Sequence, residues 1–123
     1  MNTLGIFGAH EITDAVRQVE DRLPPDVARQ LAHVKVHISR HARGVADAGD
    51  HDIRIQPQGR IKGDMAALVA VVVHECAHVV LSHHRALRSG IKTALECEYE
   101  ADNLARQWGF GPELERRKLY FGR

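Results

Sequence analysis

The residues best suited to chemistry lie in one short segment, His74-Glu75-Cys76-Ala77-His78, which has the pattern HExxH. On an α-helix, positions i and i+4 lie one above the other, so both imidazoles can bind one metal ion. Glu75 lies near the same ion without binding it, and there it can accept a proton from water. The pattern therefore predicts a zinc site with His74 and His78 as ligands and Glu75 as general base.

The residues on both sides of this segment are apolar, namely Val71, Val72, Val73, Val79 and Val80. Burying two histidines and a glutamate among them is costly unless these residues are paired or bind a metal. The alternative is a pair of core histidines satisfied by backbone or carboxylate partners.

A catalytic zinc ion takes three protein ligands and leaves one position for water, so a third ligand is needed. The predicted helix over residues 92–108 contains four candidate acids. At about 100° per residue, Asp102 lies about 40° from Glu98 on the core side, whereas Glu96 and Glu100 fall on the opposite side. We predict that Glu98 is the third ligand and that Asp102 accepts a hydrogen bond from the outer nitrogen of a ligand histidine. Glu96 and Glu100 are expected to face solvent.

The N-terminal half of the chain is predicted to supply helices and a small sheet. Helical spacing of apolar residues covers 11–31, where Pro24-Pro25 interrupts the helix and Asp26 can cap its second part. Alternation predicts strands at 34–38 and 52–56 within a sheet region of residues 33–56.

The C-terminal half is predicted to supply the helices that carry the site. Asp64 is expected to cap a helix over 64–84 that is apolar nearly all round and therefore buried. The helix over 92–108 follows, and then a tail over 112–123. This order predicts one α+β domain spanning residues 1–123, with a small, mostly antiparallel sheet packed on the HExxH helix and on the glutamate-bearing helix.

Charge and hydropathy argue against two classes of partner. Lys and Arg total 17 against 16 Asp and Glu, a net charge of +1, so binding to nucleic acid by bulk charge is not expected. The longest apolar run, 65–81, is interrupted by the HExxH residues, so no membrane span is expected. The N-terminus does not have the pattern of a signal peptide, and a cytoplasmic location is expected.

The two motifs together resemble a known group of enzymes. HECAHVVLSHH followed by EYEADNLA looks like the gluzincin metallopeptidases, whose second motif is Glu, an aromatic residue, any residue, then Ala-Asp. The chain is similar to HtpX/Ste24-type catalytic domains and to stand-alone minimal gluzincins, and more loosely to the ImmA/IrrE type. The resemblance runs from Val45 to Trp108. HtpX/Ste24 enzymes are membrane proteins with longer spacing between the motifs, and this sequence departs from them in both respects.

This resemblance implies a zincin-like fold, Zn²⁺ as cofactor and hydrolysis of peptide bonds by an endopeptidase. Zinc would lower the pKa of a water molecule and polarise the carbonyl, while Glu75 takes the proton. The substrate would be a polypeptide bound as an extended strand along an edge strand within His41 to Ala48. The candidates for stabilising the oxyanion are Tyr120, Arg116 and His83. Two alternatives remain: a regulatory peptidase that cuts one specific partner, and a non-catalytic zinc-stabilised domain.

Three further groups of residues have more than one interpretation. His33, His37 and His41 share one face and are either a second metal site or surface residues of a half-exposed strand. Cys76 and Cys97 are either core residues or regulatory thiols beside the zinc. The tail carries Leu119, Tyr120 and Phe121, which predicts that it packs on the domain or lies in the cleft and restrains activity.

Overall fold

The computed structural model describes residues 1–5, 10–38, 46–56, 61 and 63–121. The class is α+β, as predicted. In chain order the elements are β1 (Asn2–Gly5), α1 (His10–Arg22), α2 (Pro25–Gln30), β2 (Lys35–Ile38), β3 (Ala46–Ala48), β4 (Asp52–Ile55), α3 (Met65–Val80), α4 (His83–Arg88), α5 (Ala94–Gln107) and α6 (Gly111–Phe121).

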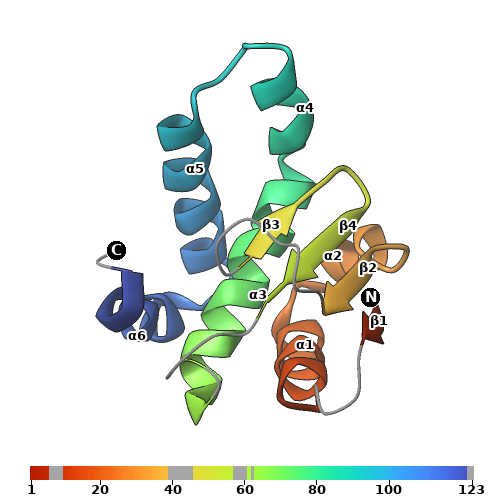
Figure 1. The fold of residues 1–123 in the computed structure, drawn as a ribbon, viewed down its shortest axis with the longest axis vertical. Helices are drawn as coiled ribbons and strands as arrows, with labels where there is room; N and C mark the ends of the chain where they lie inside the picture. Colours follow the sequence, from red (N-terminus) through yellow and green to blue (C-terminus); the bar gives the residue numbers. More distant parts are fainter. Residues whose placement is uncertain (6–9, 39–45, 57–60, 62, 122–123) are drawn as a thin grey trace.

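Helix α3 forms the centre of the fold, and its sequence explains why. Every residue from Ala67 to His78 is buried, as expected for a helix that is apolar nearly all round. The sheet and α1 lie on one side of α3, and α5 and α6 lie on the other (Figure 1). Valine-rich helices have modest intrinsic propensity, so this burial is the main source of the stability of α3.

The sheet differs from the prediction of a mostly antiparallel arrangement. Its strand order is β1-β2-β4-β3, with β1–β2 and β2–β4 parallel and only β3–β4 antiparallel. The prediction was wrong for two reasons. The N-terminal strand β1 is short and was not anticipated, and the chain after β2 first forms β3 at the far edge and then returns as β4 beside β2. The alternation itself is confirmed, since Val36, Ile38, Ile53 and Ile55 are all buried.

The predicted helix over 64–84 ends earlier than expected. α3 stops at Val80, and Ser82 adopts a left-handed conformation with φ of 54° before α4 begins at His83. Neither a glycine nor a proline marks this break.

The prediction that Asp26 caps the second N-terminal helix was also wrong, because Pro24 occupies the cap position and no side chain caps the helix.

The last two helices begin and end at clear signals. Thr93 and Glu96 form a reciprocal capping box at the start of α5. Gly109, with φ of +97°, ends it. The predicted tail is then helix α6, which packs against α3 and α5 and buries Leu114 and Arg117. The expectation that the tail packs on the domain is thus confirmed, and removing it would expose core residues.

Asp64 caps α3 as predicted, and two residues of α6 bind the same carboxylate. Its Oδ1 accepts a hydrogen bond from the backbone N–H of Ala67, while Oδ2 accepts from Tyr120 and Arg116. Burial raises the pKa of the Asp64 carboxyl, but these hydrogen bonds outweigh it and hold the pKa below its usual value.

We expect Asp64→Ala to lower the free energy of unfolding by about 1–2 kcal/mol, the usual cost of a lost N-cap. Asp64→Asn should cost less, because an amide oxygen still caps the helix. Because the folded-state pKa is lowered, the ionised carboxylate stabilises the fold fully above about pH 4 and loses this effect as the pH falls through the folded-state pKa. Urea denaturation at pH 7 and pH 3 measures the free energy of unfolding of wild type and Asp64→Ala. If the difference between the two proteins is as large at pH 3 as at pH 7, the prediction is contradicted.

Among the described residues, no helix has both the length and the hydropathy needed to cross a bilayer.

Candidate metal centre

Three side chains from two helices converge at one point. Helix α3 presents His74 and His78 one turn apart, and α5 lies alongside and presents Glu98. The Nε2 atoms of His74 and His78 are 3.0 Å apart. Each also lies 3.0 Å from a carboxylate oxygen of Glu98, Oε2 for His74 and Oε1 for His78. Within the described part of the chain, these three residues are the one group of His, Cys, Asp or Glu side chains placed to share an ion.

The outer nitrogen of His74 is bound by Asp102, as the sequence predicted. The two atoms, His74 Nδ1 and Asp102 Oδ1, are 2.8 Å apart. Arg117 of α6 donates to the same carboxylate, at 3.0 Å from Oδ1 and 3.3 Å from Oδ2. An ionised carboxylate accepts hydrogen bonds only, so Nδ1 of His74 carries a proton and donates it to Asp102, while Nε2 faces Glu98 and His78.

The outer nitrogen of His78 is bound by another histidine. Its Nδ1 lies 2.8 Å from Nδ1 of His83, whose Nε2 lies 2.8 Å from Oε1 of Glu100. Lys92 donates to both oxygens of Glu100, at 2.6 and 2.8 Å. Glu100 was predicted to face solvent, and 38% of its side chain is exposed, but it also binds His83 and Lys92. The chain from α4 to the start of α5 folds back beside α5 and places His83 and Lys92 over that face. Glu96 is exposed as predicted.

The predicted general base, Glu75, is buried close to the three converging side chains. Its residue is 6% exposed, and its Oε2 atom accepts no hydrogen bond from any described residue. Burial raises the pKa of the Glu75 carboxyl to about 7, against the lowering effect of the nearby His74 ring. A carboxyl with this pKa can gain and lose a proton near neutral pH, which general acid–base chemistry requires.

The other ionisable groups of the centre are shifted mainly by their mutual contacts. Burial raises the pKa of Glu98, but hydrogen bonds from the His74 and His78 rings outweigh it and hold the pKa well below its usual value. Burial also raises the pKa of Asp102, and its contacts with His74 and Arg117 reverse the shift. Burial lowers the pKa of His74, whereas its two carboxylate partners raise it and prevail. Glu98 and Asp102 are therefore ionised at neutral pH.

The structure does not bring the oxyanion candidates to this centre. Tyr120 and Arg116 both bind Asp64 at the start of α3. Asp64 precedes His74 by ten residues, which corresponds to about 15 Å along a helix. His83 lies on the Nδ1 side of His78, away from the three converging atoms.

The other candidates of the sequence are placed as follows. His33 is exposed, and His37 is half-buried on β2. Neither belongs to the group of residues placed to share an ion. His41 lies outside the described residues. Cys76 and Cys97 are buried, and burial raises the pKa of both thiols. Both therefore stay protonated and unreactive, as expected of core residues.

The predicted edge strand is described only in its last part. β3 lies at one edge of the sheet and packs against α3. Residues 41–45 of the predicted substrate-binding segment lie outside the described residues. Asp47 of β3 is near enough to Glu75 for its charge to raise the pKa of that carboxyl, so this edge runs beside the proposed base.

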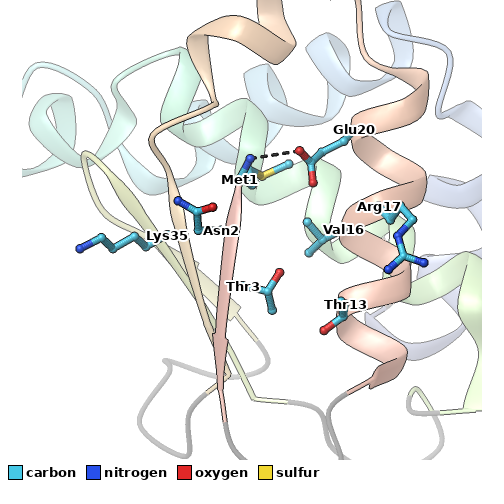
Figure 2. Close-up of a pocket in the computed structure, with 8 residues that line it drawn as sticks. All are labelled: Met1, Asn2, Thr3, Thr13, Val16, Arg17, Glu20 and Lys35. Carbon is cyan, nitrogen blue, oxygen red and sulfur yellow. Dashed lines mark hydrogen bonds and ion pairs between the residues drawn. The ribbon is translucent and has the colours of Figure 1, made fainter.

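An open pocket of about 660 Å³ lies elsewhere, between β1 and α1 (Figure 2). Its lining includes the amino group of Met1, which is ion-paired with Glu20 at 3.1 Å. None of the residues that line it is a predicted site residue, so it is separate from the metal centre.

Two contributors to the centre were not found from the sequence. Arg117 and Lys92 each neutralise a carboxylate that binds a histidine ring. The one signal for Arg117 is its place three residues after the buried Leu114, on the inner face of α6. No pattern indicates Lys92, because it lies between two helices.

Comparisons with protein-family models, with curated proteins and with solved structures found no match for this chain.

Proposed function

We propose that this protein is a zinc-dependent endopeptidase of the gluzincin type with a zincin-like fold. The observation that carries the proposal is the triangle formed by the Nε2 atoms of His74 and His78 and the carboxylate of Glu98, with all three separations at 3.0 Å. A neutral His74 with its proton on Nδ1 has the lone pair of Nε2 in this triangle, beside the carboxylate of Glu98. A metal ion bound between the three groups would accept a lone pair from each of them.

The donor set fits zinc. Two imidazole nitrogens and one carboxylate are a known ligand set of catalytic zinc sites, which keep a fourth position open. Ligand bonds of about 2.0–2.1 Å in a tetrahedral site place neighbouring ligand atoms about 3.3 Å apart, close to the separations found here. The contact between His74 and Asp102 is the carboxylate–histidine support that such sites use.

Zinc bound there would supply a lowered pKa for water and an electrophile for the scissile carbonyl. Glu75 supports the hydrolytic part of the proposal, because its raised pKa suits it to accept a proton from water and to pass it to the leaving amine. Its unpartnered Oε2 is available for that proton. A site that only stabilised the fold would have no use for such a base. β3 is the last strand of the described sheet and lies beside α3, and such an edge strand is suited to pairing with an extended peptide.

The first test is metal binding by the purified chain. We expect about one zinc ion per chain and a melting temperature that falls when a chelator removes it, because the ligands join the two helices α3 and α5. Elemental analysis before and after dialysis against chelator, followed by zinc titration, measures both. No zinc on isolation together with no uptake on titration would refute the metal site.

The second test is a cleavage screen on a proteome-derived peptide library. Cleavage of many peptides supports a general endopeptidase. Cleavage of one protein alone supports a regulatory peptidase with a single partner. A zinc-loaded protein that cuts nothing supports a zinc-stabilised domain.

Asp102→Ala is expected to weaken zinc binding by about 10–100-fold, the usual effect of removing the partner of a ligand histidine. The substitution also leaves the buried Arg117 without its carboxylate, so the melting temperature should fall as well. Competition with a chromophoric chelator measures the zinc affinity. Asp21→Ala on the exposed side of α1 is the control, and equal affinities for the two variants would contradict the role of Asp102.

A further inference from the structure

We propose that His83 and Glu100 are positioning residues that hold the ring of His78 through its Nδ1, so that its Nε2 faces the point where a metal ion would bind. The inference rests on the proposed function, because it concerns a ligand of the same site. His83 and Glu100 act through His78, since neither belongs to the three-residue cluster placed to share an ion.

The direction of the hydrogen bonds follows from the carboxylate at the end of the chain of contacts. Lys92 donates to both oxygens of Glu100, as it would to an ionised carboxylate. Such a group accepts only, so Nε2 of His83 must donate to it across 2.8 Å. In a neutral His83, Nδ1 then carries a lone pair and accepts the proton of His78 Nδ1, also across 2.8 Å. With Nδ1 bound in this way, Nε2 is the nitrogen of His78 that faces His74 and Glu98.

The two ligand histidines are therefore supported in the same way from opposite sides. His74 Nδ1 donates to Asp102, which is neutralised by Arg117. His78 Nδ1 reaches a neutralised carboxylate through one intermediate ring. Each arrangement leaves Nε2 as the ring nitrogen that faces the common point.

The backbone is shaped to bring His83 to this position. In an unbroken helix, residue 83 would be rotated about 140° from residue 78, with its ring turned away. Instead α3 ends, and Ser82 has a φ of 54°, the one positive φ at a non-glycine residue among those described. Side chains rarely adopt this conformation, and it is concentrated at functional positions. After this turn the rings of His78 and His83 lie 5.0 Å apart between centroids.

The burial of His83 supports the same conclusion. His83 is 1% exposed, although histidine is polar and the neighbouring His84 is exposed. A ring so enclosed cannot contact a substrate. Its two nitrogens contact His78 and Glu100, so its effect on chemistry must pass through His78.

The test measures zinc affinity in four variants of the full chain by competition with a chromophoric chelator. His83→Leu and Glu100→Ala should weaken zinc binding by about 10–100-fold. His83→Asn should restore most of the affinity lost in His83→Leu, because its side-chain oxygen can accept the proton of His78 Nδ1. Glu96→Ala is the matched control, because Glu96 is the same residue type on the same helix and, among the described residues, binds the helix cap at Thr93. It should bind zinc like the wild type.

A second readout follows the ring of His78 itself. In protein labelled with ¹⁵N-histidine, the Nδ1 signal of His78 should have the chemical shift of a protonated nitrogen, with slow exchange of its proton with water. In His83→Leu that exchange should become faster. A purely structural loss of packing would lower the melting temperature without this change at one ring nitrogen.

Equal zinc affinities of Glu100→Ala and Glu96→Ala would overturn the inference, as would a His78 Nδ1 that is unprotonated in the wild type. If His83→Leu does not fold, the comparison between the two glutamate variants decides. If the wild type takes up no zinc, the proposed function fails, and the His78 signal in the metal-free protein still decides whether His83 fixes the ring.

Discussion

Glu75→Gln is expected to leave zinc bound and to reduce peptide hydrolysis by about 10²–10⁴-fold or more, the range attributed to a general base. Gln has the shape of Glu and leaves the three ligands His74, His78 and Glu98 in place. It cannot accept the proton from water. The variant should therefore separate metal binding from chemistry more cleanly than any other single change in the chain.

The melting temperature supplies an internal control for this variant. Glu75 is buried, and its Oε2 has no partner among the described residues. Replacing an ionisable buried group by a neutral one of equal shape should leave the stability of the metal-free protein unchanged or higher. Glu115→Gln on the exposed face of α6 is the matched substitution, and it should cleave like the wild type.

The measurement is the rate of cleavage of peptides selected by the library screen, with zinc content determined on the same samples. Equal rates for Glu75→Gln and wild type would remove Glu75 from the mechanism. Loss of zinc from Glu75→Gln would indicate that Glu75 is a ligand.

Glu98→Ala is expected to abolish cleavage together with zinc binding, since it removes one of three protein ligands. Its zinc affinity should fall by more than the factor of about 10–100 expected for Asp102→Ala, which removes the partner of a ligand and not the ligand itself. Of the three proposed ligands, Glu98 is the one that would bring negative charge to the ion. Glu96 and Glu100 lie on the same helix, so their alanine variants serve as comparisons for Glu98→Ala.

Three glutamates on that helix should behave differently. Glu98→Ala should lose zinc, Glu100→Ala should retain it with weakened affinity, and Glu96→Ala should affect only the capping of α5. Zinc titration of all three variants measures this order. If Glu96→Ala loses zinc while Glu98→Ala keeps it, the assignment of the third ligand is wrong.

Much of the candidate site could be predicted from local sequence alone. The spacing of His74 and His78 determines that their rings share a helix face, because four residues make slightly more than one turn. The same arithmetic placed Glu98 and Asp102 on one side of the next helix. Both were found in contact with the histidines of α3. These results depend only on helix periodicity, which acts between residues close in sequence.

The rest was decided by tertiary structure. Helix periodicity put Glu100 on the solvent face, where 38% of its side chain is exposed, but it could not show that the chain after the turn at Ser82 brings His83 and Lys92 into contact with its carboxylate. Arg117 joins the centre because α6 packs on α3, a contact between segments far apart in sequence. The parallel pairing of β2 with β4 has the same origin, since strand neighbours are chosen by the path of the whole chain.

The sequence by itself thus determined which residues can bind a metal and which helices carry them. Tertiary structure decided which groups bind the outer nitrogens of the two histidines. The physical reason is that the spacing of His74 and His78 is set by the repeat of a single helix, whereas their outer contacts come from separate elements whose meeting depends on how the core packs.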